Sequence, residues 1–164
     1  MTVWEFVELV NWNAWILYDF LKMNVFEDIM PYPFQKDPID YFTKKLEIET
    51  KCRKNVYDGR MLIEKLKYQQ LLGRSMLHNR EPVYIVSTPE GVKLFPLNDI
   101  KFEWTKRSCP KTTEFENNNK IDKEIALINP EDGIDLILLH QWKIDEGTGT
   151  VWTYQKLLYE YKEK

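Results

Sequence analysis

Two short stretches rich in β-branched and aromatic residues constrain the fold more than any other part of this chain. They are residues 82–88 (PVYIVST) and 92–97 (VKLFPL), and Pro89-Glu90-Gly91 separates them. Runs of this kind, joined by a short turn that contains Gly, are typical of an antiparallel β-hairpin. The sequence therefore predicts a hairpin near the middle of the chain.

The residues that follow the hairpin also favour β-structure. Residues 100–105 (IKFEWT) alternate apolar and polar side chains, which predicts a third antiparallel strand, and 107–120 are expected to form a loop. Residues 123–128 are predicted as a short strand. Residues 134–144 and 150–161 flank a Gly-containing link, so we expect a long second hairpin, although the first of these segments also fits a helical period.

The first part of the chain has a helical pattern instead. Thr2 and Glu5 form a capping box, which signals a helix start. One stripe at helical spacing is apolar: Val3, Val7, Val10, Ala14, Leu17 and Leu21. Asn13 is a plausible second N-cap, so two short helices remain an alternative to one long helix.

The opposite stripe of this predicted helix carries tryptophans among carboxylates. The stripe includes Glu8, Trp12, Trp15 and Asp19, and Trp4 lies close beside it. One interpretation is that the helix is covered on both faces and the tryptophans belong to the core. The other is an exposed aromatic patch, rimmed by acids, that binds a protein partner.

Residues 38–72 are predicted to be mostly helical, with an interruption near 50–58. Asp37 followed by Pro38 favours a helix start, and Gly73 is a suitable C-terminal stop for a helix over 60–72. Residues 46–52 (LEIETKC) are ambiguous, because they also alternate as a strand would.

These elements together predict an α+β fold, in which a helical N-terminal half packs against a mainly antiparallel β-sheet formed by the C-terminal half. With 164 residues, the chain is expected to form a single compact domain over 1–164. Its portion 1–77 would be mainly helical and its portion 78–164 mainly β.

The cellular compartment is predicted from three observations. No segment has the roughly 18 uncharged apolar residues that a membrane span requires. The first residues lack a basic region and a cleavage site typical of a signal peptide. Two cysteines, Cys52 and Cys109, lie far apart in the sequence and fit a reducing compartment. We therefore expect a cytoplasmic protein without a membrane partner, or one in the host cytoplasm if it is viral.

Charge is strongly segregated along the chain. Residues 41–111 carry fifteen basic and eight acidic side chains, whereas 1–40 and 112–164 are both acidic. One interpretation is that the acidic flanks fold against the basic middle; the other is a nucleic-acid contact. The basic residues of this second interpretation are Lys51, Arg53, Lys54, Arg60, Lys65 and Lys67.

Common catalytic and metal-binding motifs are absent from the sequence. It contains no GxGxxG, P-loop, GxSxG or HExxH motif. His78 and His140 have no local carboxylate or Cys partners at the spacing that a metal site requires. No cofactor, no resident metal and no catalytic residue are therefore predicted in the main interpretation.

One short pattern does suggest chemistry. Glu49-Thr50-Lys51 follows an alternating segment, and Asp40 lies upstream. This D…ExK arrangement resembles the PD-(D/E)xK nuclease superfamily over these few residues only. The resemblance implies that Asp40 and Glu49 bind a divalent metal and that Lys51 positions the attacking water. It also implies that the two acids lie on adjacent strands, whereas Asp40 is in a segment predicted as helix.

The sequence thus leaves two functions open. The main prediction is a non-enzymatic cytosolic interaction protein, such as a phage or mobile-element anti-defence inhibitor, that binds a macromolecular partner through the tryptophan face. The alternative is a nucleic-acid-binding protein that uses the basic middle, with metal-dependent nuclease activity as its enzymatic form.

Overall fold

The computed structural model describes residues 14–34, 37–53, 58–88, 91–110, 119–143 and 150–156. Two helices lie in this part of the chain, α2 (Ala14–Asn24) and α3 (Lys65–His78). The strands are β1 (Met30–Pro31), β2 (Tyr41–Phe42), β3 (Leu46–Cys52), β4 (Met61–Glu64), β5 (Glu81–Thr88), β6 (Gly91–Pro96), β7 (Thr105–Pro110), β8 (Lys120–Ile128), β9 (Ile134–Lys143) and β10 (Thr150–Lys156). Two 3₁₀ turns, η1 (Leu97–Asp99) and η2 (Pro130–Asp132), complete the described elements.

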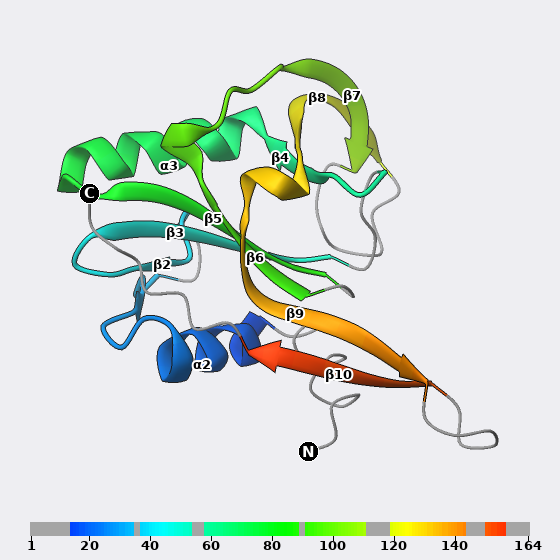
Figure 1. Cartoon of the computed structure of the whole chain (residues 1–164). Helices are drawn as coiled ribbons and strands as arrows, with labels where there is room; N and C mark the ends of the chain where they lie inside the picture. The colour runs from blue at the N-terminus through cyan, green and yellow to red at the C-terminus, as the bar shows by residue number, and fades with distance from the viewer. Residues whose placement is uncertain are drawn as a thin grey trace.

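The strands form two sheets. The larger sheet has seven strands in the order β1-β2-β3-β5-β6-β9-β10, and the smaller sheet has three in the order β4-β8-β7. In the larger sheet β3 and β5 are parallel, while every other neighbouring pair is antiparallel. Helix α2 lies on one side of the larger sheet, and α3 with the smaller sheet lies on the other (Figure 1).

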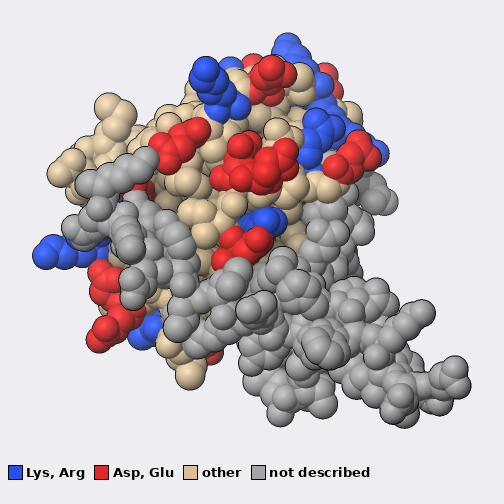
Figure 2. Space-filling view, viewed as in Figure 1, with Lys and Arg blue, Asp and Glu red and all other residues tan. Residues whose placement is uncertain are grey.

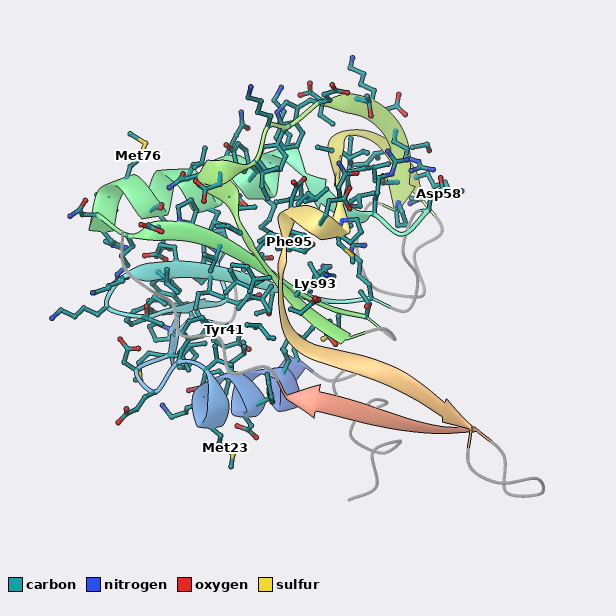
Figure 3. All side chains as sticks on the ribbon, viewed as in Figure 1. Met23, Tyr41, Asp58, Met76, Lys93 and Phe95 are labelled. Carbon is teal, nitrogen blue, oxygen red and sulfur yellow. The ribbon has the colours of Figure 1, made fainter. Side chains whose placement is uncertain are left out.

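The α2 side of the sheet holds one hydrophobic core. Leu17 and Leu21, from the apolar stripe predicted by the sequence, are both 0% exposed. Tyr41 of β2 stacks on Tyr18 of α2, with ring centroids 5.0 Å apart, and it points from the sheet toward the helix (Figure 3). This packing fixes β2 against α2 and so determines where the residue before β2 lies.

The α3 side holds a second core. Its fully buried members include Ile63, Leu71, Tyr84, Phe95 and Ile128. They come from β4, α3, β5, β6 and β8, so the smaller sheet and α3 cover the larger sheet together. Two acidic side chains on this side, Glu47 and Glu49, are buried.

The predicted fold class is wrong. Strands arise in both halves of the described chain, and the larger sheet contains both parallel and antiparallel pairs. Helix α3 lies near the middle of the sequence, between β4 and β5. No helix begins at Asp37, although its Oδ1 accepts the N–H of Ile39 as a helix cap would, because Tyr41–Phe42 pair with β3 instead. Residues 46–52 form strand β3, and tertiary burial of both of its faces explains why propensity failed there.

Helix α3 also differs from the prediction at both ends. It begins only at Lys65, because Met61–Glu64 pair with β8. It continues through Gly73 and ends at Asn79, whose left-handed backbone (φ 53°) caps the helix. Asn tolerates this conformation, so it replaces Gly as the stop signal.

The C-terminal strands agree better with the sequence. Both predicted hairpins are present, as β5–β6 and β9–β10. The segment 100–105 is not a third strand of the same sheet; β7 begins at Thr105 and pairs with β8 in the smaller sheet. In the described residues, no helix is long and apolar enough to cross a membrane. The single-domain organisation stays a prediction.

Candidate active site

Strand β3 carries charged side chains on a face that is covered. Successive residues of a strand point to opposite faces, so Glu47, Glu49 and Lys51 share one face. The other face carries Leu46 and Ile48, which pack in the α2-side core. The charged face therefore lies toward α3, and Glu47 and Glu49 are both buried.

Asp40 reaches this strand from β2. The register pairs Tyr41 with Ile48, which brings the preceding Asp40 level with Glu49. Its Oδ2 accepts hydrogen bonds from both the backbone N–H and the hydroxyl of Thr50, each at 2.8 Å. Asp40 is thus on an extended segment beside β3 and is not helical, which corrects the predicted helix and removes the departure from the D…ExK pattern.

Glu49 is a buried carboxylate that is only partly satisfied. Its side chain is 6% exposed, and its Oε2 has no hydrogen-bond partner among the described residues. Burial, followed by the charge of Asp40, raises the pKa of Glu49 from 4.5 to about 8, and Lys67 opposes this shift. A second positive charge near Oε2 would give this oxygen a partner and would reduce the repulsion between Glu49 and Asp40.

Lys67 of α3 provides the positive charge that is present. Its Nζ lies 3.1 Å from Oε1 of Glu49 and donates to the carbonyl oxygen of Pro38 at 2.6 Å. This lysine could not be placed beside the acids from the sequence, because it lies in α3 and the ExK tripeptide lies in β3. Its position three residues into α3 depends on where β4 ends.

Lys51 completes the predicted set. Burial and, next, the charge of Arg53 lower the pKa of Lys51, while the charges of Glu49 and Asp40 act in the opposite direction. The lysine is therefore within electrostatic reach of both acids and of a second cation. A lysine in such surroundings can act as a phosphate ligand or hold a water molecule.

A second charged network anchors the start of β3. Glu47, 0% exposed at its side chain, accepts hydrogen bonds from Arg80 at 2.8 Å and from Tyr32 at 2.7 Å, and it lies 2.7 Å from Nδ1 of His78. His78 is the last residue of α3. All of these groups are satisfied internally, so the network reads as structural support for β3.

The structure disperses the rest of the predicted basic surface. Lys65 pairs with Glu124, and Arg60 pairs with Asp58. Lys54 lies outside the described residues. On the face seen in Figure 2, Lys and Arg side chains are interspersed with Asp and Glu side chains. Of the predicted set, Lys51 and Lys67 act on the Glu49 carboxylate, and Arg53 lies near Lys51.

The predicted tryptophan face is largely untested. Trp4, Glu8 and Trp12 lie outside the described residues, and the side chain of Trp15 is not described. Asp19 is exposed on α2. The structure gives no support for a partner-binding surface at these residues.

The two acids suit a divalent cation that takes its other ligands from substrate and water. No group of three or more His, Cys, Asp or Glu side chains in the described residues could hold a metal ion by itself. Mg²⁺, however, is commonly held by one or two carboxylates together with substrate phosphates and water. The unpartnered, buried Oε2 of Glu49 fits this role.

Comparison with known proteins yields one low-similarity match to report. No protein-family model matches the chain, and no curated protein matches it. Among solved structures, the chain is similar to Hjc, a Holliday junction resolvase from the archaeal hyperthermophile Archaeoglobus fulgidus, with a TM-score of 0.46 and 16% identity. The match covers 73% of this chain and 92% of the resolvase.

The main functional prediction, a non-enzymatic inhibitor such as a viral one that acts by protein–protein contact, is wrong. The described site, in which Asp40 lies beside the buried Glu49, agrees better with the nucleic-acid alternative. The absence of a recognised motif was weak evidence in the sequence, because the two acids are brought together only by the β2–β3 pairing.

Proposed function

We propose that this protein is a metal-dependent nuclease that hydrolyses phosphodiester bonds, and that Asp40, Glu49 and Lys51 form its active site. The observation that carries the proposal is the orphaned carboxylate oxygen of Glu49. It is buried, it lies on the strand face next to Asp40, and it has no hydrogen-bond donor in the described part of the chain. A buried acidic atom without a partner is costly and indicates a ligand.

The roles follow from position. Asp40 and Glu49 would hold the divalent cation, which supplies Lewis-acid activation of water and of the phosphoryl oxygen when bound. Thr50 holds the Asp40 carboxylate through two hydrogen bonds, so its orientation is fixed before substrate arrives. Lys51, on the same strand face as Glu49, would bind the phosphate or orient the attacking water.

The cations near the acids favour a phosphate substrate. Lys51 and Lys67 act on the Glu49 carboxylate and Arg53 lies near Lys51, so a polyanion would meet positive charge on entry. A neutral substrate would gain nothing from this arrangement. Nucleic acid is the substrate class that matches both the metal-binding acids and the surrounding cations.

The test is cleavage of labelled DNA and RNA by the purified full chain, with Mg²⁺ or Mn²⁺ and with EDTA. We expect metal-dependent cleavage, which Glu49→Gln and Asp40→Asn each reduce by at least ~100-fold because each removes a metal ligand. Asp58→Asn is the matched control, since Asp58 is exposed and lies away from β3. Intact substrates in every metal, or full activity in Glu49→Gln, would reject the proposal.

A further inference from the structure

The half-buried cations of this protein fall into two groups. Nine Lys and Arg side chains of the described residues have intermediate exposure. Seven of them lie within 4.0 Å of a carboxylate oxygen: Arg60, Lys65, Lys67, Arg74, Arg80, Lys93 and Lys123. In the described part of the chain, Lys51 and Arg53 are the two that have no such partner.

Arg53 is held in place although it lacks a counter-charge. One of its terminal nitrogens, NH2, donates to the carbonyl oxygen of Leu62 at 3.0 Å, and its own backbone N–H donates to the carbonyl of Ser87. Its Nε is buried and donates to no acceptor in the described residues. A positioned guanidinium with an unused donor is suited to an oxyanion.

The neighbouring charge makes this arrangement costly without a ligand. Arg53 directly follows the last residue of β3, so its side chain falls on the same side of the extended chain as that of Lys51. The charge of Arg53 repels the half-buried Lys51, and the carboxylate of Glu49 lies on the other side of Lys51 along the chain. An anion beyond Lys51 would relieve the repulsion.

We infer that Arg53 binds a second phosphate of the substrate strand, next to the phosphate that Lys51 faces. This inference rests on the proposed function and names its substrate more closely. The strand would run along β3 from Glu49 toward Arg53. The preferred substrate is then a polynucleotide with at least one phosphate beyond the scissile bond, and a mononucleotide ester is a poor substrate.

Binding without metal tests the inference apart from cleavage. The affinity of the full chain for a labelled single-stranded DNA oligonucleotide is measured in EDTA across a range of salt concentrations. We expect Arg53→Gln to weaken binding about tenfold and to lower the salt slope by about 0.7, the value for one lost phosphate contact on a single strand. Arg60→Gln, an equal loss of charge at an ion-paired position, should change both values little.

Neutral linkages give a test that does not depend on the variant folding. Individual phosphates of a short oligonucleotide are replaced by methylphosphonates, one at a time. A methylphosphonate at either of two adjacent linkages should weaken binding by the native protein. For Arg53→Gln with a native circular dichroism spectrum, a methylphosphonate should weaken binding at only one of these two linkages. The inference would be overturned if the native protein bound every substituted oligonucleotide equally well, or if folded Arg53→Gln had an unchanged salt slope. Metal-dependent cleavage with either of these results would leave the proposed function standing, so the two failures are distinguishable.

Discussion

Nζ of Lys67 lies 3.1 Å from Oε1 of Glu49, so helix α3 is tied directly to the candidate metal ligand on β3. The same ammonium donates to the carbonyl of Pro38, two residues before Asp40. One side chain therefore connects both acid-bearing segments. Lys67 acts as a positioning residue, because it keeps Oε1 occupied and leaves Oε2 of Glu49 without a partner.

Lys67→Met should weaken both the fold and the activity. Without the ammonium, Glu49 loses the ion pair that holds its Oε1, and the more weakly acting Lys51 remains as its counter-charge. We expect a loss of about 1–2 kcal/mol in the free energy of unfolding at pH 8, less than for a fully buried pair because Lys67 is partly exposed. We also expect a fall in kcat of about tenfold or more with a smaller change in KM. Urea unfolding and steady-state cleavage measure these effects, and Lys67→Arg should recover part of the activity.

Lys65→Met is the matched control for Lys67→Met. Lys65 lies in the same turn of α3, but it pairs with the exposed Glu124 on β8. Its loss should change stability by at most about 0.5 kcal/mol and leave kcat unchanged. Equal effects of the two substitutions on kcat would show that Lys67 has no special connection with Glu49.

The candidate site shows how far sequence reasoning could go. The Glu49-Thr50-Lys51 tripeptide and Asp40 were singled out in the sequence through their resemblance to the D…ExK pattern. Their proximity could not be found, because Asp37-Pro38 also signals a helix start. What decides the outcome is tertiary: Tyr41 packs on Tyr18, which places this segment beside β3 as a strand.

The fold was predictable where local signals and burial agree. The β5–β6 hairpin has apolar residues on both faces, and both faces are covered, so its pattern is unambiguous. In β3 the face toward α3 is charged yet buried, and a pattern of hydrophobicity cannot reveal a buried acid. The error therefore falls on the strand that carries the candidate site, where function overrides the usual pattern.

The raised pKa of Glu49 predicts a pH-dependent stability in the absence of metal. The folded-state value of about 8 exceeds the ordinary value of 4.5, so the fold favours the protonated form. The stabilisation is fully present below pH 4.5 and is lost as the pH rises through about 8. Glu49→Gln should therefore be more stable than the native chain at pH 8.5 by roughly 2–4 kcal/mol, given about 1.4 kcal/mol per pKa unit. Chemical denaturation in EDTA at pH 5.5, 7 and 8.5 measures the difference.

The comparison needs a control, because other groups titrate over the same range. Glu131→Gln removes an exposed carboxylate of η2 and should follow the native pH profile. Excess Mg²⁺ should narrow the gap between the native chain and Glu49→Gln at pH 8.5, since a cation favours the ionised acid. A constant difference from pH 5.5 to 8.5 in EDTA would show that Glu49 titrates normally.

Two Gly→Ala substitutions should change stability in opposite directions. A Cβ at Gly133 would lie 2.6 Å from Cε1 of Phe95, a ring that is 0% exposed in the core beneath α3. Phe95 lies deep inside the molecule (Figure 3), where its ring has no room to move away. Gly133→Ala should therefore cost about 1–3 kcal/mol of unfolding free energy.

Gly73 is exposed within α3 and has nothing within 4 Å of an added Cβ, so Gly73→Ala should stabilise the protein by about 0.5–1 kcal/mol. Urea denaturation of both variants measures the pair, and a neutral Gly133→Ala would mean that the contact between η2 and Phe95 is looser than the structure has it.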